Sequence, residues 1–81
     1  MESTSDFREL VEYIVTSLVD NPDQVTVSET DQRDTIVLEI SVAGPDMGRV
    51  IGKGGRVVNS IRTLVQVLAA KQGKRVSLEV L

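Results

Sequence analysis

The chain has 81 residues, of which 41% are hydrophobic and 26% charged, so it fits one small globular domain and has no room for a second core. Because it contains neither cysteine nor histidine, disulfide scaffolds, zinc fingers and catalysis by thiol or imidazole groups are excluded. The formal net charge of −3, taken alone, disfavours a nucleic-acid partner, because lysine and arginine bind phosphate.

The first predicted element is a helix that Ser5 or Asp6 caps and that ends at Asn21-Pro22. Its apolar residues recur at steps of three and four, which places them on one face: Phe7, Leu10, Val11, Ile14, Val15 and Leu18. Apolar and polar residues then alternate over 25–28 and again over 35–42. This period of two predicts two antiparallel strands joined by a polar turn over 31–34.

The second half of the chain predicts two more helices and a strand. Gly44-Pro45-Asp46 ends the second strand and opens a short helix that runs to about Ile51. A long helix begins at Arg56 and ends before Gly73, a natural left-handed cap. Four of its apolar residues are expected in the core: Ile61, Leu64, Val65 and Leu68. The last strand carries Val76, Leu78 and Val80 on one face.

This order of elements predicts an α+β fold with a three-stranded mixed sheet covered on one face by three helices. The hairpin is antiparallel, and the last strand lies parallel to the second because a helical crossover joins them. The residues expected on the open face of the sheet are polar: Thr26, Thr35, Glu39, Ser77 and Glu79.

The charge is distributed unevenly along the chain. Residues 1–46 have a net charge of −9, whereas residues 47–81 carry seven basic residues and one acidic residue, a net charge of +6. A basic half on an acidic domain is typical of a footprint for an anionic ligand. A solvated basic face without a partner is the alternative reading.

Residues 52–55, Gly-Lys-Gly-Gly, form a loop between the two predicted helices, here called the glycine loop. One glycine is enough to end a helix, so three glycines in four positions favour close approach of a ligand to the backbone. The loop also opens a helix, whose free N–H groups attract anions. It is neither a P-loop, because Gly54 stands where the hydroxyl residue belongs, nor a dinucleotide fingerprint, because Val57 stands where the last glycine belongs.

The segment Val50-Ile51-Gly52-Lys53-Gly54-Gly55-Arg56-Val57-Val58 resembles the Ile-Gly-x-x-Gly signature of KH domains, whose loop clamps the backbone of about four nucleotides. The order of elements is similar to the prokaryotic, type II variant. The resemblance covers residues 1–81 as a single KH domain with its GxxG loop at 52–55. A chain of this size also resembles the family of small bacterial RNA-binding KH proteins typified by KhpA, also called YlqC.

This resemblance implies a set of residues that bind single-stranded RNA. Gly52 and Gly55 become the defining glycines, Ile51 and Val58 underlie one wall of a groove, and strands two and three supply the other wall with Lys74 and Arg75 at its entrance. The short connection over 72–74 favours weak, broad recognition. The expected RNA-binding residues are Arg49, Ile51, Gly52, Lys53, Gly54, Gly55, Arg56, Val58, Asn59, Lys74 and Arg75.

The resemblance further implies an RNA chaperone or post-transcriptional regulator that pairs with a KhpB-type protein in control of cell shape and envelope synthesis. The longest uncharged stretch, residues 63–70, is too short to span a bilayer, and no signal segment opens the chain, so a cytoplasmic protein without catalytic residues, metal or cofactor is expected. A small core also favours a homodimer.

Two other classes of function are weighed against RNA binding. The first is a KH-fold protein-interaction module that does not bind RNA, although Lys53 in the loop argues against it. The second is a carboxylate enzyme built on Asp31 and Asp34. It is disfavoured because both residues fall in a polar turn where no desolvated pocket is expected.

Overall fold

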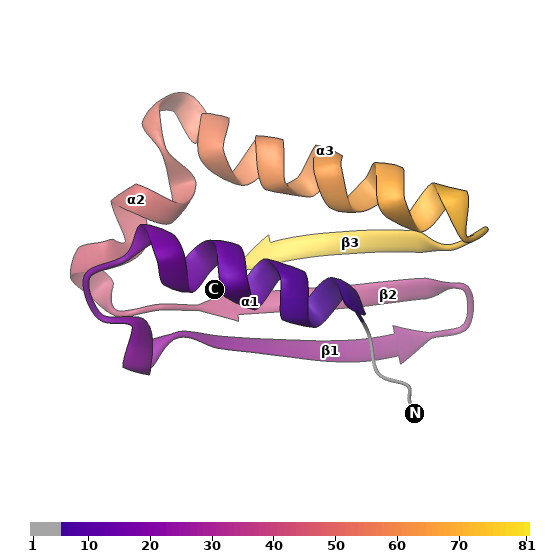
Figure 1. Ribbon diagram of the computed structural model, residues 1–81, viewed down its shortest axis with the longest axis horizontal. Coiled ribbons are helices and arrows are strands. Elements are labelled where there is room, and N and C mark those ends of the chain that lie inside the picture. Colours follow the sequence, from indigo (N-terminus) through magenta and orange to yellow (C-terminus); the bar gives the residue numbers. More distant parts are fainter. Residues whose placement is uncertain (1–5) are drawn as a thin grey trace.

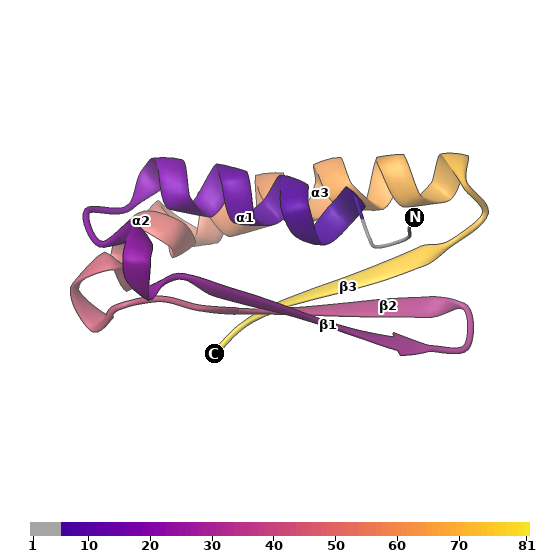
Figure 2. The ribbon, with the colours of Figure 1, turned by 60° about the horizontal axis from the view of Figure 1, so that its bottom comes forward.

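A computed structural model of the chain describes residues 6–81 and shows two layers, a three-stranded sheet and a layer of helices (Figure 1). Helices α1 (Asp6–Leu18) and α3 (Arg56–Lys71) run across the same face of the sheet, and the short helix α2 (Met47–Ile51) lies at one end of it. Figure 2 shows that the helices leave the opposite face of the sheet open. The predicted α+β arrangement is therefore confirmed.

The sheet contains β1 (Thr26–Gln32), β2 (Thr35–Ser41) and β3 (Arg75–Val80), in the order β1-β2-β3. β1 pairs with β2 antiparallel, and β2 pairs with β3 in parallel. The crossover between β2 and β3 contains both α2 and α3, so the predicted mixed topology is confirmed. It also places the glycine loop at the end of the sheet where β2 finishes and α3 begins.

The hairpin differs from the sequence expectation at its turn. β1 continues through Asp31 and Gln32, which pair with Ile36 and Thr35, so the predicted turn over 31–34 is wrong at its first two residues. Strand pairing uses backbone groups, and β1 is an edge strand, so polar side chains do not end it. The turn itself is Arg33-Asp34, and Arg33 adopts the left-handed φ of 58° that such a tight connection requires.

The open face of the sheet is polar, as expected. Thr26 and Glu79 are exposed, and Thr35, Glu39 and Ser77 are half-buried. The alternating residues on the other face pack under the helices, because successive side chains of a strand point to opposite faces. Leu38 and Ile40, in the middle strand, are completely buried there.

The core lies between this face and the helices α1 and α3. It comprises Phe7, Val11, Val15, Val27, Ile36, Leu38, Ile40, Val50, Val58, Ile61, Val65, Ala69, Val76 and Leu78. Two expected core residues are outside it: Leu64 is 47% exposed, and Leu68 is half-buried and packs against the core. Val58, Ile61, Val65 and Ala69 are the buried residues of α3, and Leu64 lies about 100° around the helix from Val65, at the edge of that stripe.

The end of α3 agrees with the sequence, whereas α1 ends at Leu18, before the predicted stop at Asn21-Pro22. Gly73 has a φ of 70°, and its N–H and that of Lys74 donate to the carbonyls of Ala70 and Ala69 at 3.0 and 2.9 Å. This cap turns the chain directly into β3. The predicted cap at Ser5 or Asp6 lies outside the described residues and side chains. Within residues 6–81, no helix is both long enough and apolar enough to cross a membrane.

Candidate nucleic-acid interface

The carboxylate of Asp46 fixes the start of α2 against the segment that follows α1. It is 1% exposed and accepts three hydrogen bonds from residues 25 and 26 positions earlier in the chain. The Asp20 N–H donates to Oδ1 at 3.2 Å, and the backbone N–H and the side-chain amide of Asn21 donate to Oδ2 at 3.0 and 3.1 Å. The sequence pattern places Asp46 only at the start of a helix, because nothing local reveals a contact with residues 20 and 21.

Burial raises the pKa of Asp46, but hydrogen bonds from the Asn21 side chain and from the backbone of Asp20 and Asn21, together with the charge of Arg49, outweigh this effect. The pKa of Asp46 therefore lies below its ordinary value, and the group is a carboxylate at neutral pH. Three charge-assisted hydrogen bonds to this buried carboxylate therefore tie the start of α2 to residues 20 and 21.

Arg49, on the same short helix, forms an ion pair with Asp20 at 3.3 Å. Both side chains are more than half exposed, so the pair contributes less than about 1 kcal/mol to stability. It nevertheless places an acidic side chain beside one of the cations expected to meet RNA. The charge of Arg49 is therefore partly offset by that of Asp20.

The glycine loop begins at Gly52, where the backbone leaves α2. Gly52 N–H donates to the Gly48 carbonyl at 2.8 Å, and Gly52 itself adopts φ 78° and ψ 170°, a conformation essentially restricted to glycine. A Cβ at this position would lie 2.8 Å from both the Cβ and the N atom of Val57, so the loop folds directly onto the first turn of α3. Glycine is required here by both backbone angle and space.

The remainder of the loop is a single 3-10 turn, Lys53–Gly55, in which Gly54 and Gly55 also have positive φ, 65° and 78°. Gly55 N–H donates to the Gly52 carbonyl at 3.1 Å and closes the turn. All three glycines therefore have positive φ, which glycine adopts readily. The sequence expectation attributed the three glycines to close approach of a ligand, and backbone conformation is a second reason for them. Lys53 and Gly54 are exposed at its tip.

Helix α3 opens directly from the loop. Its N-cap is Gly55, which supplies no side-chain hydrogen bond to the first turn. The positive end of a 16-residue helix therefore faces the loop, and the exposed Arg56 adds a full charge to it. Val58, 7% exposed, belongs to the core, and Ile51, the last residue of α2, is half-buried.

A bridge joins α3 to the edge of the sheet three residues beyond Asn59. Arg62 donates from Nη1 to Asn59 Oδ1 at 2.6 Å and from Nη2 to the Leu78 carbonyl in β3 at 3.0 Å. Arg62 was not among the expected site residues. Its basic character was the available signal, but only the fold shows that it reaches β3.

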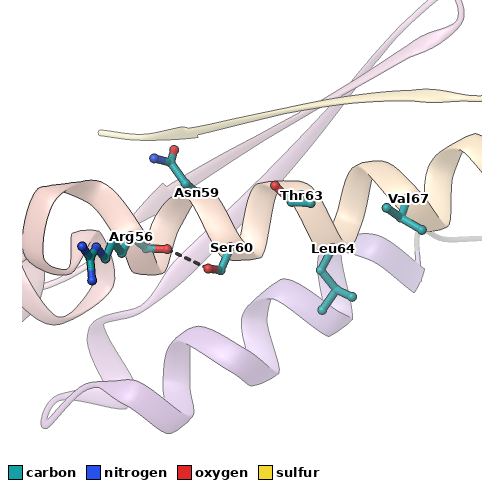
Figure 3. A pocket seen from close by; sticks show the side chains of 6 residues that line it. All are labelled: Arg56, Asn59, Ser60, Thr63, Leu64 and Val67. Carbon is teal, nitrogen blue, oxygen red and sulfur yellow. Dashed lines mark hydrogen bonds between the residues drawn. The ribbon is translucent and has the colours of Figure 1, made fainter.

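The exposed side of α3 forms a shallow depression along the helix (Figure 3). In this view Asn59 and Leu64 point to different sides of the helix, and Arg56 lies at the loop end. Leu64 and Val67 are 47% and 52% exposed, so the floor is partly apolar. The residues that line the depression are Arg56, Asn59, Ser60, Thr63, Leu64 and Val67.

The structure does not bring all the expected RNA-binding residues together. Lys74 and Arg75 lie where α3 turns into β3, at the opposite end of the molecule from the loop (Figure 1). A 16-residue helix is about 24 Å long, and this length separates the two groups. Lys74 and Arg75 instead lie beside the β1–β2 turn, and Arg75 N–H donates to the Asp34 carbonyl at 3.1 Å.

The chain is similar in sequence to known proteins over almost its whole length. Residues 8–80 match the family described as "KhpA/KhpB, KH domain". The chain belongs to this family. It is 51% identical to the RNA-binding protein KhpA of Caldanaerobacter subterraneus, over 90% of this chain and 97% of that protein. It is 49% identical to KhpA of Clostridium acetobutylicum and 45% identical to that of Chlamydia pneumoniae, each over 91% of this chain and at least 95% of the other protein.

Membership confirms the KH fold and the family resemblance drawn from the glycine loop. The family is one of RNA-binding domains without enzymatic activity, as expected. A solved structure, that of a point variant of Aquifex aeolicus Era bound to GDP·AlF4−, superimposes with a TM-score of 0.62 at 22% identity. The match covers 91% of this chain and 29% of Era, so the same fold occurs there as one part of a larger protein.

Proposed function

We propose that the chain binds single-stranded RNA through the glycine loop. The observation that carries this proposal is an exposed, glycine-kinked turn at the positive end of α3, flanked by Lys53 and Arg56, in a chain whose relatives are named RNA-binding protein KhpA. The loop has no bulky side chain at Gly54 or Gly55, so a phosphodiester backbone can lie directly on it.

In this proposal the residues act in three groups. Lys53, Arg56 and, more weakly, Arg49 attract phosphates, and the backbone of the glycine loop holds them. Ile51 and Val58 support the loop from below. Asn59 contacts nucleotides along α3. Lys74 and Arg75 contact only an RNA strand that is long enough to follow α3 to its far end. The whole chain, residues 1–81, acts as one KH domain with its GxxG loop at 52–55.

Replacing both loop-tip residues tests the proposal. Lys53→Asp with Gly54→Asp should abolish binding of a fluorescein-labelled 12-nucleotide RNA, measured by anisotropy, because it puts two negative charges where phosphate should lie. The fold should survive. Lys53 is exposed, a Cβ at Gly54 meets nothing within 4 Å, and aspartate tolerates positive φ better than most residues.

The matched control is Lys71→Asp with Gln72→Asp, which changes the net charge by the same amount at the exposed far end of α3. This variant should keep most of the affinity. In the parent protein, log Kd against log salt should give a slope of magnitude about 2, corresponding to roughly three phosphate contacts on a single strand. Parental affinity in the loop variant, or an equal loss in both variants, would disprove the assignment to the loop.

The cellular role and the protein partner are proposed from membership of the family. The family name pairs KhpA with KhpB, which supports a KhpB-type partner. A role as a cytoplasmic RNA chaperone or post-transcriptional regulator in cell shape and envelope synthesis is proposed from the family resemblance. A KH-fold interaction module without RNA binding is the alternative, and it is the conclusion to draw if no RNA binds to the parent protein.

A homodimer is also proposed, with a second copy covering the exposed Leu64 and Val67 on α3. Burial of this apolar strip would supplement the small core of an 81-residue domain. Light scattering at high micromolar concentration should give twice the mass of the chain. Val67→Glu, which introduces a charge into the strip, should return the mass to that of the monomer. A monomeric parent protein would refute the dimer.

A further inference from the structure

Arg62 differs from the other cations near the loop because its side chain is held from two sides. It is half-buried, and its two terminal nitrogens donate to Asn59 Oδ1 on α3 and to the Leu78 carbonyl on β3. β3 is an edge strand whose alternate residues face β2. Arg75 and Leu81 donate to the carbonyls of Asp34 and Ile40 on that side, so the Leu78 carbonyl points away from β2, toward the free edge. The guanidinium therefore lies between the helix that begins at the loop and the exposed edge of the sheet.

Arg62 also continues a line of polar groups that starts at the loop. Gly55, Asn59 and Arg62 are separated by four and three residues, which places them on one face of α3. The Asn59 amide nitrogen lies 3.5 Å from the point that a Cβ on Gly55 would occupy. An RNA strand that places one phosphate on the glycine loop and its next bases toward β3 would contact the Arg62 guanidinium.

The chemistry of the bound guanidinium restricts what it can recognise. The group has five N–H donors and no acceptor, and two donors are engaged by Asn59 and Leu78. The remaining donors suit a partner with two neighbouring acceptors on one edge. Guanine offers O6 and N7, and cytosine offers O2 and N3, whereas no edge of adenine or uracil places two base acceptors next to each other. Phosphates are identical in every nucleotide, so the exposed Lys53 and Arg56 carry no such information.

We propose that Arg62 is a specificity-determining residue that makes the domain favour guanine or cytosine over adenine and uracil at one position of the bound strand. The proposal rests on the RNA binding proposed above and adds a base preference to it. Asn59 acts as a positioning residue, because its Oδ1 atom holds one nitrogen of the guanidinium.

The test uses four eight-nucleotide RNAs: all uridine, and the same strand with one central guanosine, cytidine or adenosine. We expect the parent protein to bind the guanosine or the cytidine strand about tenfold more tightly than the all-uridine and adenosine strands. Arg62→Lys keeps the charge but loses the planar fork, so all four affinities should become equal within about twofold, at the level of the all-uridine strand. Arg56→Lys is the matched control and should keep the preference.

Because Arg62 also donates a hydrogen bond to β3, the thermal midpoint of Arg62→Lys is measured first to establish that the variant is folded. NMR provides a second readout on the unmutated protein. The Arg62 Nε–H resonance should shift more with the preferred strand than with the adenosine strand. Equal binding of the four RNAs by the parent protein would refute the proposal, and so would a preference that survives Arg62→Lys. If the parent shows no preference yet Lys53→Asp with Gly54→Asp abolishes binding, only this inference fails. If the parent binds no RNA, the proposed function fails with it.

Discussion

Gly52→Ala should destabilise the domain by roughly 3 kcal/mol or more, which lowers the thermal midpoint by more than about 12 °C for a domain of this size. Two effects combine. Alanine is strained at φ 78° and ψ 170°, and its Cβ would lie 2.8 Å from the backbone N atom of Val57. The nitrogen belongs to the first turn of α3 and cannot move without displacing the helix. Circular dichroism melting measures the change.

Gly54→Ala is the matched control for this variant, because it lies two residues away in the same glycine loop. Its φ of 65° is also left-handed, but a Cβ there meets nothing within 4 Å. The expected cost is the conformational strain alone, about 1 kcal/mol. If the two variants melt at the same temperature, the close approach of Gly52 to Val57 is not what fixes the loop on α3.

Asp46→Asn should lower the thermal midpoint by roughly 5–15 °C at pH 7, although it changes almost no volume. Both carboxylate oxygens accept hydrogen bonds from N–H groups of Asp20 and Asn21. In asparagine one of these oxygens becomes an NH₂ group that faces a donor, so at least one buried contact becomes repulsive. Asp23→Asn, at an exposed position in the next turn, is the control and should melt like the parent protein.

The effect of Asp46 should depend on pH in a defined direction. Its folded-state pKa is lowered from an ordinary value of 3.8, so the carboxylate stabilises the fold fully above that value and this contribution disappears as the pH falls through the lower, folded-state pKa. The difference in midpoint between the parent and Asp46→Asn should therefore be constant from pH 7 to about pH 5 and shrink below about pH 4. A difference that grows on acidification would contradict the assignment.

Much of the candidate site could be predicted because its signals are local. The kink at 52–55 follows from three glycines between two helical periodicities, and Lys53 and Arg56 are adjacent to it in sequence. The strand order also follows, since a hairpin and a helical crossover leave few arrangements. The predicted turn over 31–34 failed because backbone pairing, which side-chain polarity does not report, continues β1 to Gln32.

The residues that sequence analysis missed or misplaced all depend on distance in space. Asp46 meets residues 25 and 26 positions away, and Arg62 meets Leu78 across 16 positions. Neither contact leaves a periodic trace in the sequence. Lys74 and Arg75 belong to the same basic half as the loop, yet α3 carries them to the opposite end of the sheet.

The sequence by itself determined that the basic charges gather after residue 46 and that the glycine loop opens a helix, because composition and turn chemistry are properties of neighbouring residues. The net charge of −3 therefore does not exclude an anionic partner. Only the tertiary structure decided which of those cations share a surface and which are separated by a helix about 24 Å long. It also decided which are neutralised, as Arg49 is by Asp20, and which are held beside the sheet, as Arg62 is.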